Sequence, residues 1–434
     1  MNFAEATQYL LSLGHETLTM KLGLRNTELL LDSLGNPQKS YESVQIAGTN
    51  GKGSTAVMLD SICRAAGVVT GLYTSPHLTC ITERISIGGQ AISQEHFARF
   101  ASEVREAAKD LLAQGKIEAL PTFFEHVTAI ALLAFREADI ELAILETGLG
   151  GRLDATTVAG ANTVGITSVS LDHQEYLGET LEEIAFEKAA IIRPGVTAII
   201  APQSSPVLEV ILKRGSECDV KVSVGGCRAF ELSATPEGMF AVTFETNEDQ
   251  YEDVHLNLRG RHQVANAGLA IQLAESLRSR GFAISKTAIV RGIERAWYEG
   301  RLTSFSGTLL DGAHNPGAAR VLRDYLDEFV KVPLTLVFGA MNDKRLTEMA
   351  AILFPGVHQL ILTQPDNPRA ASAERLQTLA QNFIQSEKII AVPRVSDALK
   401  KAREVTLPDG LICVTGSLYL VGEASTALFR DSQN

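Results

Sequence analysis

A glycine-rich stretch with one lysine reads Gly48-Thr49-Asn50-Gly51-Lys52-Gly53-Ser54. It follows an apolar run at 44–47 and precedes a helical pattern at 56–65, so it joins a predicted strand to a predicted helix. Glycines let successive backbone N–H groups face phosphate oxygens, a lysine neutralises the outer phosphates, and a serine hydroxyl can reach a magnesium ion. The spacing departs from GxxxxGK[ST], but a plain glycine turn would leave the lysine unexplained. The stretch therefore predicts a phosphate-binding loop.

Short apolar runs alternate with helical patterns on both sides of this loop. In the first 200 residues these runs lie at 44–47, 68–73, 142–146, 163–169 and 196–201. Such alternation is typical of βα units that build a parallel sheet. The glutamate that ends the third run, Glu146, should lie at the carboxyl edge of the sheet, where open α/β sheets bind ligands.

The pattern changes in the second half of the chain. Glycine-punctuated alternation at 220–258, which includes 220–224, predicts a small antiparallel addition to the first domain. A second α/β series follows, with apolar runs at 308–313, 334–340, 359–363, 389–392 and 411–415. The fold class is therefore α/β, and we expect two domains. These are an N-terminal P-loop domain with a parallel-rich sheet over 1–295 and a C-terminal Rossmann-like domain over 296–434.

Composition restricts the partners and the cellular setting. The net charge of −12 over 434 residues disfavours nucleic acid or an anionic membrane as the main partner. The five cysteines are scattered without a CxxC pair, so we expect neither a disulfide framework nor a zinc site. The first 20 residues lack a basic leader, and no run of about 18 apolar residues follows. We therefore expect a cytoplasmic protein.

The phosphate-binding loop resembles the GTNGKGS loop of the Mur ligase superfamily, and the chain resembles its folate branch, the dihydrofolate synthase/folylpolyglutamate synthases. The resemblance runs nearly end to end, over several ordered motifs. These motifs are Leu22-Gly-Leu24, Tyr73-Thr-Ser-Pro-His-Leu78, Glu83-Arg-Ile85, Glu146-Thr-Gly-Leu-Gly-Gly-Arg-Leu-Asp-Ala-Thr156, Leu171-Asp-His173, Glu187-Lys-Ala189, Asp311-Gly-Ala-His-Asn-Pro316 and Gly416-Ser-Leu-Tyr-Leu420.

The resemblance implies an ATP-dependent ligase. In that family ATP activates a carboxylate as an acyl phosphate, and the amine of L-glutamate then displaces the phosphate. The implied substrates are dihydropteroate, reduced folates and L-glutamate. The implied cofactors are ATP, magnesium at two sites and potassium, and the implied assembly is a monomer. Chemistry also demands metal and lysine here, because a transferring phosphoryl group carries charge that must be neutralised.

The resemblance also assigns residues to the nucleotide and its metals. The nucleotide-binding residues are Thr49, Asn50, Gly51, Lys52, Gly53, Ser54, Asn266, Arg301, Asp311 and His314. The metal-binding residues are Ser54, Ser75, Glu146, His173 and Lys188, and the catalytic residues are Lys52, Glu146, His173 and Lys188. Lys188 is expected to be carbamylated. Taken alone, His173 would be interpreted as a helix cap, Lys188 as a solvated helix face, and Asp311 as the start of a turn.

Two segments match the positions that bind dihydropteroate in bifunctional members of the family. They contain Thr122, Phe123, Phe124 and Glu125, and Arg152, Leu153, Asp154 and Ala155. Either phenylalanine could stack on a flat pterin ring, and Asp154 could accept hydrogen bonds from its amino groups. Core packing is the alternative interpretation for both phenylalanines.

Three other functions compete with this one. A different Mur-type ligase would share the phosphate loop and metal ligands, and a folylpolyglutamate synthase would lack the first ligation. A P-loop regulator, which is not an enzyme, would bind ATP or GTP without any dependence on glutamate. Phosphate release with and without glutamate and dihydropteroate distinguishes the regulator from the ligases.

Overall fold

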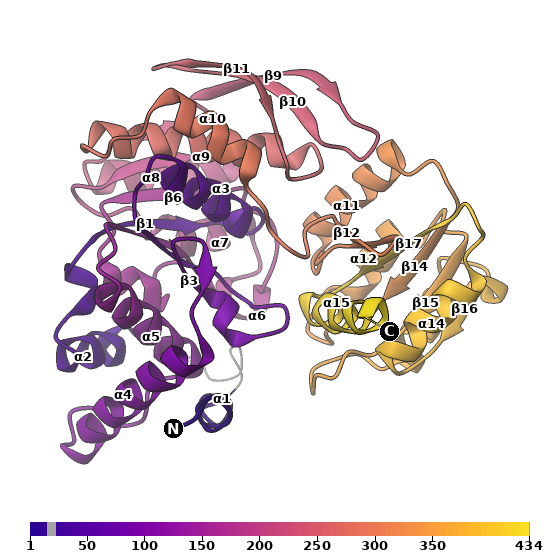
Figure 1. Ribbon diagram of the computed structural model, residues 1–434, viewed down its shortest axis with the longest axis horizontal. Coiled ribbons are helices and arrows are strands. Elements are labelled where there is room, and N and C mark those ends of the chain that lie inside the picture. Colours follow the sequence, from indigo (N-terminus) through magenta and orange to yellow (C-terminus); the bar gives the residue numbers. More distant parts are fainter. Residues whose placement is uncertain (15–22, 434) are drawn as a thin grey trace.

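The computed structural model describes residues 1–14 and 23–433. Leu22, which begins one family motif, lies outside the described residues, as does the terminal Asn434. Two sheets with flanking helices lie side by side, and a small three-stranded sheet covers the helices of the first (Figure 1). We call the residues up to Arg295 the first unit and the residues from Ala296 onward the second unit. In the described part of the chain, no helix combines the length and apolarity needed to cross a bilayer.

The first sheet has eight strands in the order β4-β3-β2-β5-β1-β6-β7-β8. The parallel strands are β1 (Glu42–Ala47), β2 (Thr70–Tyr73), β5 (Leu142–Glu146), β6 (Thr163–Ile166), β7 (Thr197–Ile200) and β8 (Val222–Val224). At one edge β3 (Ile85–Ile87) and β4 (Gln90–Ala91) run antiparallel. The register pairs Ile46 with Glu146, so the carboxyl ends of β1 and β5 meet. The predicted parallel-rich sheet is confirmed.

The assignment of 220–224 to the antiparallel addition is wrong. Val222–Val224 forms β8, which pairs in parallel with β7 at the edge of the large sheet. The antiparallel addition contains only β9 (Cys227–Ala234), β10 (Phe240–Thr246) and β11 (Gln250–His255). A three-residue strand carries too little alternation to reveal which neighbour it pairs with.

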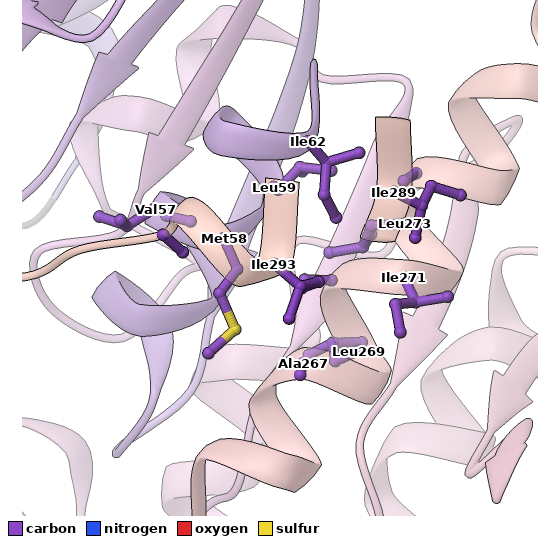
Figure 2. Close-up of a cluster of buried hydrophobic side chains, with 14 of the residues drawn as sticks. Val57, Met58, Leu59, Ile62, Ala267, Leu269, Ile271, Leu273, Ile289 and Ile293 are labelled. Carbon is purple, nitrogen blue, oxygen red and sulfur yellow. The ribbon is translucent and has the colours of Figure 1, made fainter. Parts of the chain in front are cut away.

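The helix that follows the glycine-rich stretch is α3 (Lys52–Ala65), and it packs between α9 (His262–Ser279) and α10 (Lys286–Arg295). Figure 2 shows the apolar side chains of these three helices in one cluster. A Cβ at Gly292 of α10 would lie 2.3 Å from Cα of Ile62, so only glycine permits this approach. Packing of α3 thus fixes the start of the helix, where the phosphate-binding loop ends.

The second sheet has the order β12-β13-β17-β14-β15-β16. Its strands are β12 (Thr303–Phe305), β13 (Thr308–Leu310), β14 (Leu334–Phe338), β15 (Gln359–Leu362), β16 (Ile389–Ala391) and β17 (Leu411–Thr415). All pair in parallel except β12, which is antiparallel to β13. The predicted Rossmann-like α/β sheet is confirmed.

The remaining helices cover the sheets. In the first unit they are α1 (Phe3–Ser12), α2 (Arg25–Ser33), α4 (Gln94–Ala113), α5 (Phe123–Glu137), α6 (Gln174–Leu177), α7 (Leu181–Ala189) and α8 (Ser205–Glu217). In the second unit they are α11 (Pro316–Phe329), α12 (Leu346–Leu353), α13 (Ala373–Ala380), α14 (Val395–Val405) and α15 (Leu418–Gln433). Short 3-10 turns occupy η1 (Pro37–Lys39), η2 (Ile81–Arg84), η3 (Ala155–Ala159) and η4 (Ser386–Lys388).

Candidate active site

A cavity of about 620 Å³ receives residues from both units, at the ends of their parallel strands. Nearly every site residue predicted from the sequence lines it. These are Thr49, Asn50, Gly51, Lys52, Gly53, Ser54, Ser75, Thr122, Phe124, Glu125, Glu146, Arg152, Leu153, Asp154, Ala155, His173, Lys188, Asn266, Arg301, Asp311 and His314. Phe123 is the one predicted residue that is not among them.

The glycine-rich loop is held by the segment that follows β6. Thr49 N–H donates to the carbonyl of Ser168 (2.8 Å), and its hydroxyl donates to the carbonyl of Ser170 (3.0 Å). Gly48 has a φ of 145°, and a Cβ there would lie 1.8 Å from Oγ1 of Thr167. Side chains rarely adopt such a φ, so glycine is needed on both counts. The loop is therefore preorganised, with Lys52 at the first position of α3.

The first residues of α9 complete this end of the cavity. Gln263 Nε2 donates to the hydroxyl of Ser54 (3.3 Å), and Asn266 Nδ2 donates to Oε1 of Gln263 (2.9 Å). Gly51 has a φ of 89°, and a Cβ there would lie 2.3 Å from Oδ1 of Asn266. Asn266 therefore lies directly against the phosphate-binding loop, although more than 200 residues separate them.

Hard oxygen donors converge beside Lys52. Glu146 ends β5 and is buried, and the backbone N–H of Ser75 donates to its Oε2 (3.1 Å). Burial raises the pKa of Glu146, while the neighbouring ammonium of Lys52 acts in the opposite direction. Together with the hydroxyl of Ser54, these groups offer one carboxylate and two serine oxygens.

This donor set suits magnesium better than a metal ion that is coordinated by protein side chains alone. Within residues 1–14 and 23–433, no three His, Cys, Asp or Glu side chains come together in a way that could hold a metal ion. Magnesium usually takes one or two carboxylates and completes its shell with water and phosphate oxygens. Glu146, Ser54 and Ser75 meet that requirement beside a phosphate-binding loop.

Lys188, which is buried, and His173, which is partly buried, line the same cavity and both have lowered pKa values. Nζ of Lys188 donates to the carbonyl of Gly48 (2.7 Å). Burial, aided by the charge of Lys52, lowers the pKa of Lys188 to about 7. His173 has a positive φ of 50°, and burial lowers its pKa to about 3, so the imidazole is neutral at physiological pH. The lowered pKa makes the neutral amine of Lys188 far more populated than that of an exposed lysine.

Asp172 joins the two units and was not assigned a role from the sequence. It is buried and accepts hydrogen bonds from Nζ of Lys344 (2.9 Å) and Nδ2 of Asn315 (2.8 Å), both in the second unit. Nε2 of His314 lies 3.6 Å from its Oδ2. Burial opposes ionisation, but His314 and the ammonium of Lys344 hold the pKa of Asp172 well below its ordinary value. Lys344 follows β14 at the carboxyl edge of the second sheet, the signal that would have revealed it.

The Asp311 turn shapes the second unit's side of the cavity. Asp311 accepts hydrogen bonds from the backbone N–H groups of Leu302 and Ala313, both at 3.0 Å. Nδ1 of His314 contacts the carbonyl of Gly312 (2.9 Å), which turns Nε2 towards Asp172. Asp311 therefore ties the segment that carries Arg301 to the turn that carries His314.

The two adjacent phenylalanines at the start of α5 have different surroundings. Phe124 lines the cavity, and a Cβ at Gly148 would lie 2.5 Å from its ring. Phe123 packs in the apolar core with the guanidinium of Arg84 over its ring, 5.4 Å from the centroid. Phe123 does not line the cavity, because consecutive helical positions point about 100° apart. Phe124 is the aromatic side chain that can stack.

Thr122 and Glu125 cap the N-terminus of α5. The hydroxyl of Thr122 accepts from Glu125 N–H (3.3 Å), and the Glu125 carboxylate accepts from Thr122 N–H (2.6 Å), which is a capping box. Thr27 also donates to Glu125 (2.8 Å). These contacts fix the direction of α5 and hence the position of the Phe124 ring.

The carboxylate of Asp154 accepts hydrogen bonds from residues of its own loop. Its Oδ2 accepts from Leu149 N–H (2.9 Å), and its Oδ1 accepts from the N–H (3.0 Å) and hydroxyl (2.5 Å) of Thr156. Burial raises the pKa of Asp154, and these hydrogen bonds act against that shift. The expected direct contact with a pterin is not what this geometry favours. Asp154 instead ties the loop 148–156 into the wall of the cavity.

The other members of that segment face the cavity without such ties. Leu153 and Ala155 line the wall. Arg152 is about half exposed, and its Nε donates to Oε1 of Glu187 (3.0 Å). Its guanidinium therefore lies in the outer, exposed part of the cavity wall. The partner Glu187 directly precedes the buried Lys188 in the chain.

Two family models match this chain, one in each of its two units. The Mur ligase middle domain matches residues 46–274, and the Mur ligase glutamate ligase domain matches residues 300–418. A Bacillus subtilis dihydrofolate synthase/folylpolyglutamate synthase is 34% identical over 94% of this chain and 96% of its own length. A Haloferax volcanii protein described as a probable bifunctional folylpolyglutamate synthase/dihydropteroate synthase is 37% identical over 99% of this chain. The chain spans only 51% of that longer relative.

Solved structures agree in fold. Mycobacterium tuberculosis folylpolyglutamate synthase, complexed with ADP and AMPPCP, superposes with a TM-score of 0.91 and 31% identity, covering 98% of this chain and 99% of that one. E. coli FolC in complex with DHPP and ADP superposes with a TM-score of 0.88 and 30% identity, covering 100% and 99%.

Proposed function

This chain belongs to the Mur ligase family, in its dihydrofolate synthase/folylpolyglutamate synthase branch, and we propose that it uses ATP to ligate L-glutamate to dihydropteroate and to reduced folates. One observation carries the proposal. A single cavity combines a phosphate-binding loop, a magnesium-type donor set, an aromatic wall and cationic groups from the second unit. Those are the parts needed to activate a carboxylate and present an amine to it.

We assign the nucleotide to the loop around Lys52 and to Asn266, with Arg301, Asp311 and His314 closing the site from the second unit. The Lys52 ammonium would neutralise the outer phosphates. Ser54, Ser75 and Glu146 would hold magnesium, which supplies further neutralisation of the transferring phosphoryl group. We also assign a second magnesium to His173 and Lys188, and potassium as a further cofactor. The resemblance to the family supports these last assignments.

The folate end lies at the aromatic wall. Phe124 supplies a face for stacking, Leu153 and Ala155 supply apolar contact, and Arg152 supplies a cation at the mouth. The carboxylate to be ligated would point inward, towards Lys52 and Glu146. The tie between Asp172 and Lys344 supports closure of the two units around the reactants, which would exclude water from a hydrolysable acyl phosphate.

We propose that the chain is divided into one domain at 1–295 and another at 296–434, and that these two domains close around the reactants. The boundary falls between α10 and β12, where the chain passes from one sheet to the other. We further propose that the protein acts as a monomer in the cytoplasm, on the strength of the family resemblance.

Lys188 is expected to carry a carbamate. Formation of a carbamate needs a neutral amine, and a pKa of about 7 leaves about half of the Lys188 side chains neutral at pH 7. Carbon-13 NMR with labelled bicarbonate should show a carbamate signal that disappears in Lys188→Ala. The exposed Lys109→Ala variant should keep the signal. A bare ammonium group at Lys188 in a nucleotide-bound crystal at neutral pH would refute the modification.

The proposed activity is tested with the purified protein, ATP, magnesium and glutamate, with either dihydropteroate or a reduced folate added. Products are identified by mass. Addition of one glutamate residue to both acceptors, with phosphate released in equal amount, is expected. A product from the folate alone would make the protein a folylpolyglutamate synthase only. Phosphate release that ignores glutamate and acceptor would favour the nucleotide-binding regulator instead.

A further inference from the structure

A loop from the first unit is seated on the second unit. Residues 74–80 connect β2 to η2, and Leu78 near the end of this loop packs against the apolar cluster of α14, α15 and the second sheet. A Cβ at Gly422 of α15 would lie 1.9 Å from the carbonyl oxygen of Leu78. A Cβ at Gly300 would lie 3.1 Å from the Leu78 methyl carbons. Only glycine at 422 leaves room for the Leu78 backbone.

The first unit keeps this loop in one shape. The carboxylate of Glu83 accepts hydrogen bonds from the backbone N–H groups of Leu78 (2.8 Å) and Cys80 (2.7 Å). Nε of Arg84, which is almost fully buried, donates to Nδ1 of His77 (2.8 Å). Loops braced in this way transmit a displacement rather than absorbing it. These contacts also give the Glu83-Arg84 motif a structural role.

The other end of the loop lies at the metal-type donors. Ser75 is three residues before Leu78, and its backbone N–H donates to Glu146 (3.1 Å). A short braced segment therefore links Gly422 of the second unit to Ser75 and Glu146 of the first. On α15 the contact surface faces the first unit (Figure 1).

We infer that Gly422 and Leu78 are positioning residues, which set Ser75 and Glu146 in place only when the second unit is docked. The inference rests on the proposed function, since it assigns Ser75 and Glu146 to magnesium. Docking of the second unit, which brings Arg301 and His314, would then also complete the metal site. Phosphoryl transfer would thereby be coupled to closure.

Gly422→Ala is the sharpest test, because the change does not weaken the helix itself. Gly422 is helical, and alanine is the better helix former, so α15 should be kept. We expect the magnesium concentration for half-maximal activity to rise about 10-fold or more, as happens when groups that orient metal ligands are altered. We expect kcat to fall about 10- to 100-fold. KM for ATP should change little, since the phosphate-binding loop is untouched.

Amide hydrogen exchange gives a readout that does not depend on turnover. The amides of Ser75, Leu78 and Cys80 should exchange faster in Gly422→Ala, because their carboxylate acceptors are displaced. Thr426→Ala is the matched control on the same helix, since the Thr426 hydroxyl donates within the helix to the carbonyl of Gly422 (2.9 Å). It should leave exchange and magnesium dependence unchanged.

Leu78→Ala keeps the backbone contact at Gly422 but removes the side chain that seats the loop on the apolar cluster of the second unit. It should reproduce the loss, whereas Leu407→Ala, at an exposed leucine of the second unit, should not. Unchanged amide exchange and unchanged magnesium dependence in both Gly422→Ala and Leu78→Ala would overturn the inference. Failure of the wild-type protein to ligate glutamate would overturn the proposed function instead, and the exchange measurement would still decide the coupling.

Discussion

Lys52→Ala is expected to lower ligase turnover on the order of 10²- to 10³-fold, the usual cost of removing one preorganised group that stabilises transition-state charge. The side chain is at the first position of α3 and donates a hydrogen bond to the carbonyl of Thr49 (3.2 Å) within its own loop, so the fold should be kept. Turnover is measured as phosphate release together with product mass, and folding by circular dichroism. The exposed Lys109→Ala variant is the control.

Glu146→Ala should give a loss of similar size for a different reason. It removes the one carboxylate of the magnesium-type donor set and the acceptor of the Ser75 N–H. Raising the magnesium concentration should restore part of the Glu146→Ala activity and none of the Lys52→Ala activity. Near-normal turnover in either variant would contradict the assigned nucleotide site.

Asp154→Ala is expected to damage both ligations to the same extent, on the order of 10²-fold in kcat/KM. Three hydrogen bonds to this buried carboxylate hold the loop 148–156, and each hydrogen bond to a charged group contributes roughly 1.5–3 kcal/mol. Freeing the loop would displace the wall that carries Arg152 and Leu153. In the proposed function both the shorter and the longer acceptor would rest against that wall, so neither should be spared.

The measurement compares kcat/KM for dihydropteroate and for a reduced folylglutamate at saturating ATP and glutamate. Thr156→Val removes one of the three hydrogen bonds and should show a smaller loss, again equal for both acceptors. A loss confined to dihydropteroate would contradict the structural role. It would instead support direct recognition of the pterin by Asp154, the role first inferred from the sequence.

The parallel strands and the phosphate-binding loop were predictable because they are local. Apolar runs such as 142–146 indicate buried strands whichever strands they pair with. The glycines of the loop indicate backbone angles that residues with a side chain disfavour. Glu146 followed from the same logic, because the carboxyl ends of parallel strands meet at one edge.

The roles of individual side chains depend on their tertiary contacts, which the sequence does not reveal. Phe123 and Phe124 are identical in chemistry, and only the packing of α5 turns one inward and the other towards the cavity. Asp154 has the composition of a ligand-binding residue, yet its acceptors are filled by backbone groups two and five residues away. The buried pair of Asp172 and Lys344 joins positions 172 residues apart. A lone lysine after a strand gave no reason to pair it with that carboxylate.

The packing of α3 between α9 and α10 has a consequence for the newborn chain. Residue 52 leaves the ribosome long before Gly292 does, and at about 5–20 residues per second the interval is roughly 10 to 50 s. For most of that time α3 lacks the apolar partners drawn in Figure 2, and the Asn266 side chain that lies against the phosphate loop has not yet been synthesised. The phosphate-binding loop therefore gains its complete set of neighbours only after most of the chain has been made. Until α10 emerges, the apolar face of α3 is a surface that chaperones would be expected to cover.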